Sequence, residues 1–267
     1  MYKKIYVPLN NSEQMWKILC TSFTMSACLF ILFLADCESA AQEPRQRTPA
    51  LTDSSLFRGA VEGVVRLRGK AIPQSTRVEN TTDPAICGKV QSLEDILVSP
   101  ESRGIKNAIV ALTNVPASKI PAHQPGLLTL DNRECKFVPH VSVLTVGSTI
   151  QATNSDSTLH NTHFYGALRG NIALVEPGLI ATKIAYKPGF IIVKCDVHGW
   201  MQAFIRVDTH PFHTVTDVNG YYRITDIGEG TYNMEIWHEK FGVLQKTIRI
   251  KSQNMERIEV EYSPGNN

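Results

Sequence analysis

The chain has 267 residues, and its 27 Lys and Arg against 25 Asp and Glu give a formal net charge of +2 and a pI near 8.2. This near balance gives no case for binding nucleic acid, and no run of like charges is long enough to suggest an interaction tail. The length behind an N-terminal leader allows one large β domain or two small ones.

Residues 1–41 have the features of a secretory signal peptide. Residues 16–35 are largely apolar with Lys17 near their start, and Ser39-Ala40-Ala41 provides a cleavage site of small residues. Such a leader directs a protein to export and is removed from the mature chain. We therefore expect an exported protein, in the periplasm or outside the cell.

Two other fates of the leader stay open. The apolar run is near the lower length limit for spanning a bilayer, so its retention would anchor the protein. The sequence Leu34-Ala35-Asp36-Cys37 resembles a lipoprotein box, with Asp36 where that motif has a small residue. We expect membrane association only if the N-terminal segment is retained.

The next residues predict an all-β chain. Residues 42–56 are polar and contain prolines, so we expect a linker there. Short runs that alternate apolar and polar residues follow, with Gly, Pro and Asn between them, which is typical of a β-sandwich or barrel. The expected strands are 61–68, 107–112, 141–146, 149–154, 189–194 and 202–207. We expect Thr82-Asp83-Pro84 to cap one short helical turn that has Pro84 in its first position.

A segment with a proline, 208–213, interrupts this pattern, and we place a domain boundary there. Residues 57–208 would form the first domain, with an N-terminal extension, and residues 209–267 a small second β domain. Strands are expected in the second domain at 221–224, 232–237, 243–250 and 257–262.

The cysteine count singles out one thiol. Of 6 Cys, cleavage of the leader leaves Cys87, Cys135 and Cys195. In an oxidising compartment two cysteines tend to pair, and an odd one needs an explanation. We expect a disulfide between Cys87 and Cys135, with Cys195 free. A metal-bound thiolate is protected from oxidation, so the count favours Cys195 as a metal ligand.

Cys195 begins a short loop that contains three types of metal ligand. His198 follows Cys195 by three residues, and Met201 follows His198 by three. A thiolate, two imidazoles and a weak thioether are the ligands of a blue copper site. This set is a compromise between the preferences of Cu(I) and Cu(II). The second imidazole must come from a neighbouring strand, and His160 is the candidate.

The pattern resembles the cupredoxins, the family of plastocyanin, pseudoazurin and amicyanin. The resemblance extends over Phe137-Val138-Pro139, Val146-Gly147, Asn154, Asp156, His160-Asn161, Phe164 and Phe190–Cys195. It implies a Greek-key β-sandwich with one copper per chain, equatorial ligands His160, Cys195 and His198, and the axial ligand Met201. It also implies that Asn161 hydrogen-bonds between the ligand loops, although the residue after the cysteine is Asp196 rather than Ser or Thr.

The C-terminal part resembles a second family. The segments Val215–Tyr222 and Gly228–Tyr232 are similar to the carboxypeptidase regulatory-like (transthyretin-like) β-sandwich. That resemblance implies a small β module behind the cupredoxin core, which we expect to orient the protein or to dock it to a partner.

Three side chains near the ligands have two interpretations each. His163 follows His160 by three residues, so on an extended strand the two face opposite sides. It is either a surface residue or part of an altered copper site, and His140 is either structural or close to the metal. Trp200 either belongs to an apolar docking patch around His198 or shields the metal from water.

These observations predict an exported type 1 copper protein that carries single electrons to a redox protein partner. The ligand set fills the coordination of the metal, whereas an enzyme needs an open position for its substrate. Two alternatives stay open. One is copper storage or delivery, or a structural binding module with an altered site. The other is a copper-dependent oxidoreductase with a second metal.

Overall fold

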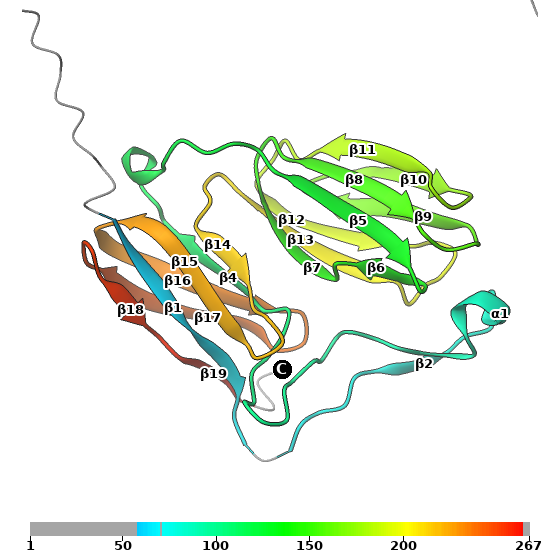
Figure 1. Ribbon diagram of the computed structural model, residues 1–267, viewed down its shortest axis with the longest axis horizontal. Coiled ribbons are helices and arrows are strands. Elements are labelled where there is room, and N and C mark those ends of the chain that lie inside the picture. The colour runs from blue at the N-terminus through cyan, green and yellow to red at the C-terminus, as the bar shows by residue number, and fades with distance from the viewer. Residues whose placement is uncertain (1–57, 70, 264–267) are drawn as a thin grey trace, which may run out of the picture. The chain divides into compact units, whose positions relative to one another are not determined.

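The structure is a computed structural model and describes residues 58–69 and 71–263 (Figure 1). The predicted signal peptide and linker lie outside the described residues. Every described residue belongs to one unit, residues 51–267. Within the described residues, no helix has the length and apolar character needed to cross a bilayer.

Nine consecutive strands form one β-sandwich. They are β5 (Leu127–Arg133), β6 (Lys136–Val138), β7 (Val141–Thr145), β8 (Thr149–Asn154), β9 (His160–Gly166), β10 (Gly170–Leu174), β11 (Ile180–Ile184), β12 (Gly189–Lys194) and β13 (Gln202–Asp208). One sheet has the order β10-β9-β12-β13-β7 and the other the order β11-β8-β5-β6. The described chain is nearly all β, so the predicted fold class is confirmed.

Alternating sequence explains how these strands bury one face. In β8, Ile150, Ala152 and Asn154 point inward while the residues between them are half-buried. Phe137 and Phe164 from other strands are 1% exposed and join the same apolar core. Side chains on a strand alternate between its two faces, so the two-residue repeat of apolar residues determines which of them enter the core. The strands predicted at 149–154 and 189–194 match β8 and β12 exactly.

Eight further strands form a second pair of sheets. They are β1 (Arg58–Leu67), β4 (Ile109–Thr113), β14 (His213–Val215), β15 (Tyr221–Gly228), β16 (Gly230–His238), β17 (Gly242–Ile250), β18 (Met255–Arg257) and β19 (Val260–Tyr262). One sheet has the order β15-β1-β18, with β19 also pairing β1, and the other the order β14-β4-β16-β17. The likeness of this part to the carboxypeptidase regulatory-like module stays a prediction.

The strand pairing differs from the expected assignment of residues 57–208 to a single domain. β1 pairs with β15, and β4 pairs with β16, so two strands from before residue 127 belong to the sheets of the C-terminal strands. Alternation of apolar residues locates a strand but does not identify its neighbour, because pairing partners are remote in sequence. The boundary at residue 208 itself stays a prediction.

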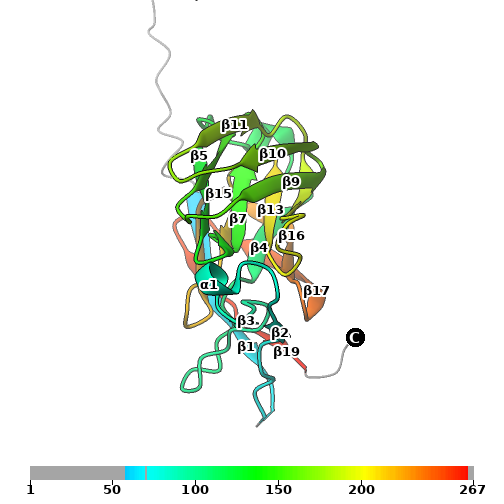
Figure 2. The ribbon, with the colours of Figure 1, turned by 90° about the vertical axis from the view of Figure 1, so that its right-hand side faces the viewer.

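A segment with little regular structure connects β1 to β4. It contains β2 (Arg77–Glu79), the helical turn α1 (Pro84–Cys87) and β3 (Val90–Ser92), and β2 pairs with β3. Pro84 is at the first helical position, as predicted, and Asp83 precedes it. The one other helix among the described residues is the 3-10 turn η2 (Ala117–Lys119). Figures 1 and 2 show α1 beside one end of the first sandwich.

His238 predicts how the protein responds to acid. Its side chain is 1% exposed, and burial lowers its pKa from 6.5 to about 4. Between these two values the unfolded chain binds a proton that the folded chain does not, so stability falls as the pH falls from 6.5 to 4. The expected loss from this residue is about 3 kcal/mol. Urea unfolding at several pH values measures it, and His238→Gln should flatten the curve. Equal pH dependence in both proteins would contradict this prediction.

Candidate metal centre

The loop from Cys195 to Met201 joins β12 to β13 and is closed by its own hydrogen bonds. The backbone N–H of Met201 donates to the carbonyl of His198 at 2.9 Å, and that of Cys195 to the carbonyl of Met201 at 3.3 Å. The N–H of His198 points at the sulfur of Cys195, 3.4 Å away. The loop therefore holds the thiol and the imidazole on the same side, and Met201 at its end is buried.

His160 reaches this loop because β9 and β12 are antiparallel neighbours. His163 of β9 pairs with Lys194, the last residue of β12, so the start of β9 lies next to Cys195. The Nδ1 atom of His160 is 4.0 Å from the sulfur of Cys195 and 3.0 Å from Nδ1 of His198, which is itself 3.8 Å from that sulfur. The structure thus gathers one sulfur and two nitrogens at one point.

These distances fit a shared metal ion. Bonds of about 2.0 Å to nitrogen and about 2.3 Å to sulfur place ligand nitrogens about 3.0–3.4 Å apart, and nitrogen and sulfur about 3.5–4.0 Å apart. Both imidazoles are 0% exposed, and Cys195 and Met201 are each 2% exposed. A thiolate with two imidazoles suits copper better than the hard cations, which prefer oxygen ligands. The donor set is therefore chemically and geometrically suited to copper.

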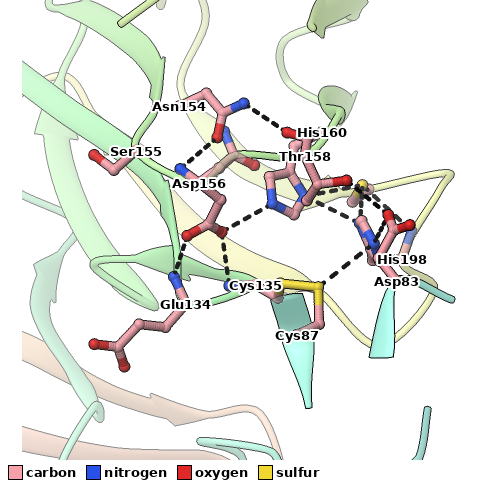
Figure 3. Close-up of polar contacts among 12 residues, drawn as sticks. Asp83, Cys87, Glu134, Cys135, Asn154, Ser155, Asp156, Thr158, His160 and His198 are labelled. Carbon is pink, nitrogen blue, oxygen red and sulfur yellow. Dashed lines mark hydrogen bonds and ion pairs between the residues drawn. A yellow bond between two sulfur atoms is a disulfide. The ribbon is translucent and has the colours of Figure 1, made fainter. Parts of the chain in front are cut away.

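His160 is oriented by a carboxylate behind it. Its Nε2 lies 2.9 Å from a carboxylate oxygen of Asp156, which also accepts backbone N–H groups of Glu134 and Cys135 (Figure 3). Burial lowers the pKa of His160, more than the bond to Asp156 raises it, which favours the neutral ring that a metal needs. A ligand histidine that donates its other N–H to a carboxylate has a defined tautomer and orientation. The family resemblance included Asp156 but implied no role for it.

His198 has a carboxylate partner that the sequence did not indicate. Its Nε2 lies 3.1 Å from a carboxylate oxygen of Asp83, which precedes α1 and is 115 residues away in the chain. The sulfur of Cys87 is 3.7 Å from the same nitrogen. No sequence signal connects Asp83 with the ligand loop, because the contact depends on how the segment from β2 to β3 folds back.

Asn161 joins the two ligand segments, as the family resemblance implied. Its side-chain oxygen accepts the backbone N–H of Asp196 at 2.7 Å and lies 3.3 Å from the sulfur of Cys195. Its amide nitrogen donates to the carboxylate of Asp196 at 2.8 Å. The carboxylate of Asp196 thus accepts a hydrogen bond from Asn161, and the backbone N–H of Asp196 donates one to it. These two bonds link the two ligand segments.

The two alternative histidines lie outside the cluster of His160, Cys195 and His198. His163 is half-buried, and its Nδ1 is 3.1 Å from the carboxylate of Asp196 and 2.8 Å from the hydroxyl of Tyr165. His140 contacts the carboxylate of Glu239 with Nε2 and the backbone carbonyl of Gln202 with Nδ1. His163 is three residues after His160 in β9, and residues an odd number of positions apart on a strand face opposite sides of the sheet. This explains why His163 lies outside the cluster.

Trp200 and the disulfide surround the ligand loop. The indole ring is half-buried, 5.1 Å from the ring of His198, and its N–H donates to the carbonyl of Cys135 at 3.0 Å. Cys135 forms a disulfide with Cys87, the pair expected from the cysteine count, while Cys195 is free and buried. Trp200 therefore lies beside His198, and both interpretations of it, a docking patch and a shield from water, stay predictions.

Comparison with known proteins gives structural likenesses only. No family model matches the chain, and no curated protein matches it. Among solved structures it resembles a copper-containing nitrite reductase from Thermus scotoductus, with 22% identity over 37% of this chain and 28% of the reductase, and a TM-score of 0.30. It also resembles a purple cupredoxin from Nitrosopumilus maritimus, with 20% identity over 31% of this chain and 99% of the cupredoxin, and a TM-score of 0.28. A reduced amicyanin variant matches at 21% identity over 38% of this chain and 99% of the amicyanin, with a TM-score of 0.27. The chain thus spans about a quarter of the reductase.

Proposed function

We propose that this protein is an exported type 1 copper protein that carries single electrons to a redox protein partner. The observation that supports this most is the buried group of two imidazole nitrogens and one thiol sulfur, all within 4.8 Å of one another. Bound copper would supply one-electron redox chemistry at this point. The chain supplies a rigid β framework that keeps its ligands in place in both oxidation states.

Burial of the ligands favours a carrier over an enzyme. His160 and His198 are 0% exposed, and Met201, the proposed axial ligand, is 2% exposed. Substrate chemistry at a metal normally needs an open coordination position and a route to it. Transfer of an electron needs neither, because the partner does not have to touch the metal.

The oxidoreductase alternative requires a second metal. Among the described residues, the other group of close ligand atoms is Cys135, Asp156 and His160. Cys135 is in a disulfide and His160 already belongs to the first group, so this set does not form an independent second site. The contacts of His140 and His163 with carboxylates also support structural roles for both residues.

Copper loading of the purified protein tests the proposal. We expect one copper per chain, an intense visible absorption from charge transfer between thiolate and Cu(II), and reversible cycling between Cu(I) and Cu(II). Elemental analysis, visible and EPR spectra and voltammetry measure these three properties. A colourless protein that binds no copper contradicts the proposal. Two coppers per chain would favour the oxidoreductase, and ready loss of Cu(I) to an acceptor would favour storage or delivery.

A further inference from the structure

Asp83 precedes a helical turn but does not cap it. A capping Asp normally has extended backbone and accepts a hydrogen bond from the first turn with its side chain. Here Asp83 has φ 51° and ψ 45°, in the left-handed region, and makes no side-chain capping bond. That conformation is uncommon for a residue other than glycine and costs free energy. Its carboxylate instead points at the ligand loop (Figure 3).

Several contacts hold Asp83 in this place. The hydroxyl of Thr158, in the turn between β8 and β9, donates to its carboxylate at 2.7 Å. Its backbone carbonyl accepts the N–H groups of Ile86 and Cys87, which close α1. Cys87 is bonded to Cys135 of the first sandwich, so the segment that contains Asp83 is covalently attached beside the metal ligands.

This segment covers the edge of His198 that faces away from the other ligands. The carboxylate of Asp83 lies 3.1 Å from Nε2, and the sulfur of Cys87 lies 3.7 Å from it. The ring of Trp200 lies 5.1 Å from the imidazole ring. With these three neighbours His198 is 0% exposed, although its loop lies at the end of a sheet.

We propose that Asp83 is a positioning residue for His198: it accepts the Nε2–H hydrogen bond and thereby directs Nδ1 toward Cys195 and His160. The proposal rests on the metal site described above. Each imidazole then has a carboxylate at its Nε2, Asp156 for His160 and Asp83 for His198. Ligand histidines are commonly fixed in this way, and loss of such a partner lowers metal affinity about 10–100-fold.

The charge of Asp83 should also affect the redox state. An aspartate side chain is ionised at neutral pH, and the carboxylate of Asp83 accepts the hydroxyl of Thr158 at 2.7 Å and lies 3.1 Å from Nε2 of His198. A negative charge beside the site stabilises Cu(II) more than Cu(I). Removing the charge should therefore weaken Cu(II) binding more than Cu(I) binding. A tenfold difference between the two losses raises the reduction potential by about 59 mV.

The test compares Asp83→Ala and Asp83→Asn with the wild type in two states. In the metal-free protein, a crystal structure of Asp83→Ala should show the His198 ring turned or spread over two orientations, whereas Asp83→Asn, which keeps an acceptor oxygen, should restore the ring. In the copper-loaded protein, Asp83→Ala should lower Cu(II) affinity about tenfold or more and raise the potential. Thr158→Val, which removes the bond that holds Asp83, should shift both quantities in the same direction by less. Glu79→Gln, which removes an exposed carboxylate from the same segment, should change neither.

The outcomes separate this inference from the proposed function. An unmoved His198 ring in metal-free Asp83→Ala overturns the positioning role whether or not the wild type binds copper. Unchanged affinity and potential in a copper-loaded Asp83→Ala also overturn it, while the copper function stands. If the wild type binds no copper, the proposed function fails, and the ring orientation still decides the role of Asp83.

Discussion

Replacing Cys195 with alanine is expected to abolish the visible absorption of the copper-loaded protein completely and to lower its copper affinity more than any other single substitution. The sulfur of Cys195 is the one thiol among the gathered ligand atoms, so the charge-transfer transition has no other origin within the described residues. The remaining imidazoles have no soft anionic partner and bind Cu(I) poorly. Absorption spectra and competitive titration with a copper chelator measure the two effects.

Matched variants separate loss of the ligand from loss of packing. Val193→Ala truncates a residue of β12 that is 0% exposed, two residues before Cys195, and leaves all four proposed ligands unchanged. It should lower stability, as large-to-small core substitutions do, and leave the absorption in place. Met201→Leu should keep the thiolate absorption, but it should change the wavelength of that band and the reduction potential of the copper. An intense band that survives in Cys195→Ala would mean that the thiolate of another residue binds the copper.

The strands and the ligand loop were accessible from sequence because their signals are local. Alternation of apolar residues defines a strand within six residues, and β8 and β12 were predicted exactly for that reason. The loop places Cys195 and His198 three residues apart, so the short chain between them brings their ligand atoms together. His160 was reached through the family resemblance rather than through any pattern that connects it to Cys195.

What the sequence did not indicate depends on contacts between remote segments. β1 and β4 joined the C-terminal strands because a strand buries its apolar face against any sheet that fits, and many pairings satisfy the same alternation. Asp83 was expected to cap a helical turn, but it precedes that turn without a side-chain capping bond, and its carboxylate contacts His198 instead. The Asp83–His198 contact spans 115 residues and requires an uncommon backbone conformation, which residue type alone does not predict.

Replacing Asp156 with alanine is expected to lower copper affinity about 10–100-fold, the usual effect of losing a carboxylate that orients a ligand histidine. Asp156 fixes Nε2 of His160 at 2.9 Å and is itself held by the N–H groups of Glu134 and Cys135, both at 2.8 Å (Figure 3). Without it, His160 can present either tautomer, and the N–H groups of the buried residues Cys135 and His160 lose their acceptor.

Unpaired buried donors should also destabilise the Asp156→Ala protein by about 1–3 kcal/mol. Asp156→Asn keeps one acceptor oxygen and should fall between the wild type and the alanine variant in both properties. Glu134→Gln is the matched control, because the side chain of Glu134 points away from the site and only its backbone N–H contacts Asp156 (Figure 3). Chelator competition measures the affinity, and urea unfolding measures the stability. If affinity stays unchanged while stability falls, Asp156 supports the fold around Cys135 but does not orient the ligand, and His160 must be held by its neighbours in β9 alone.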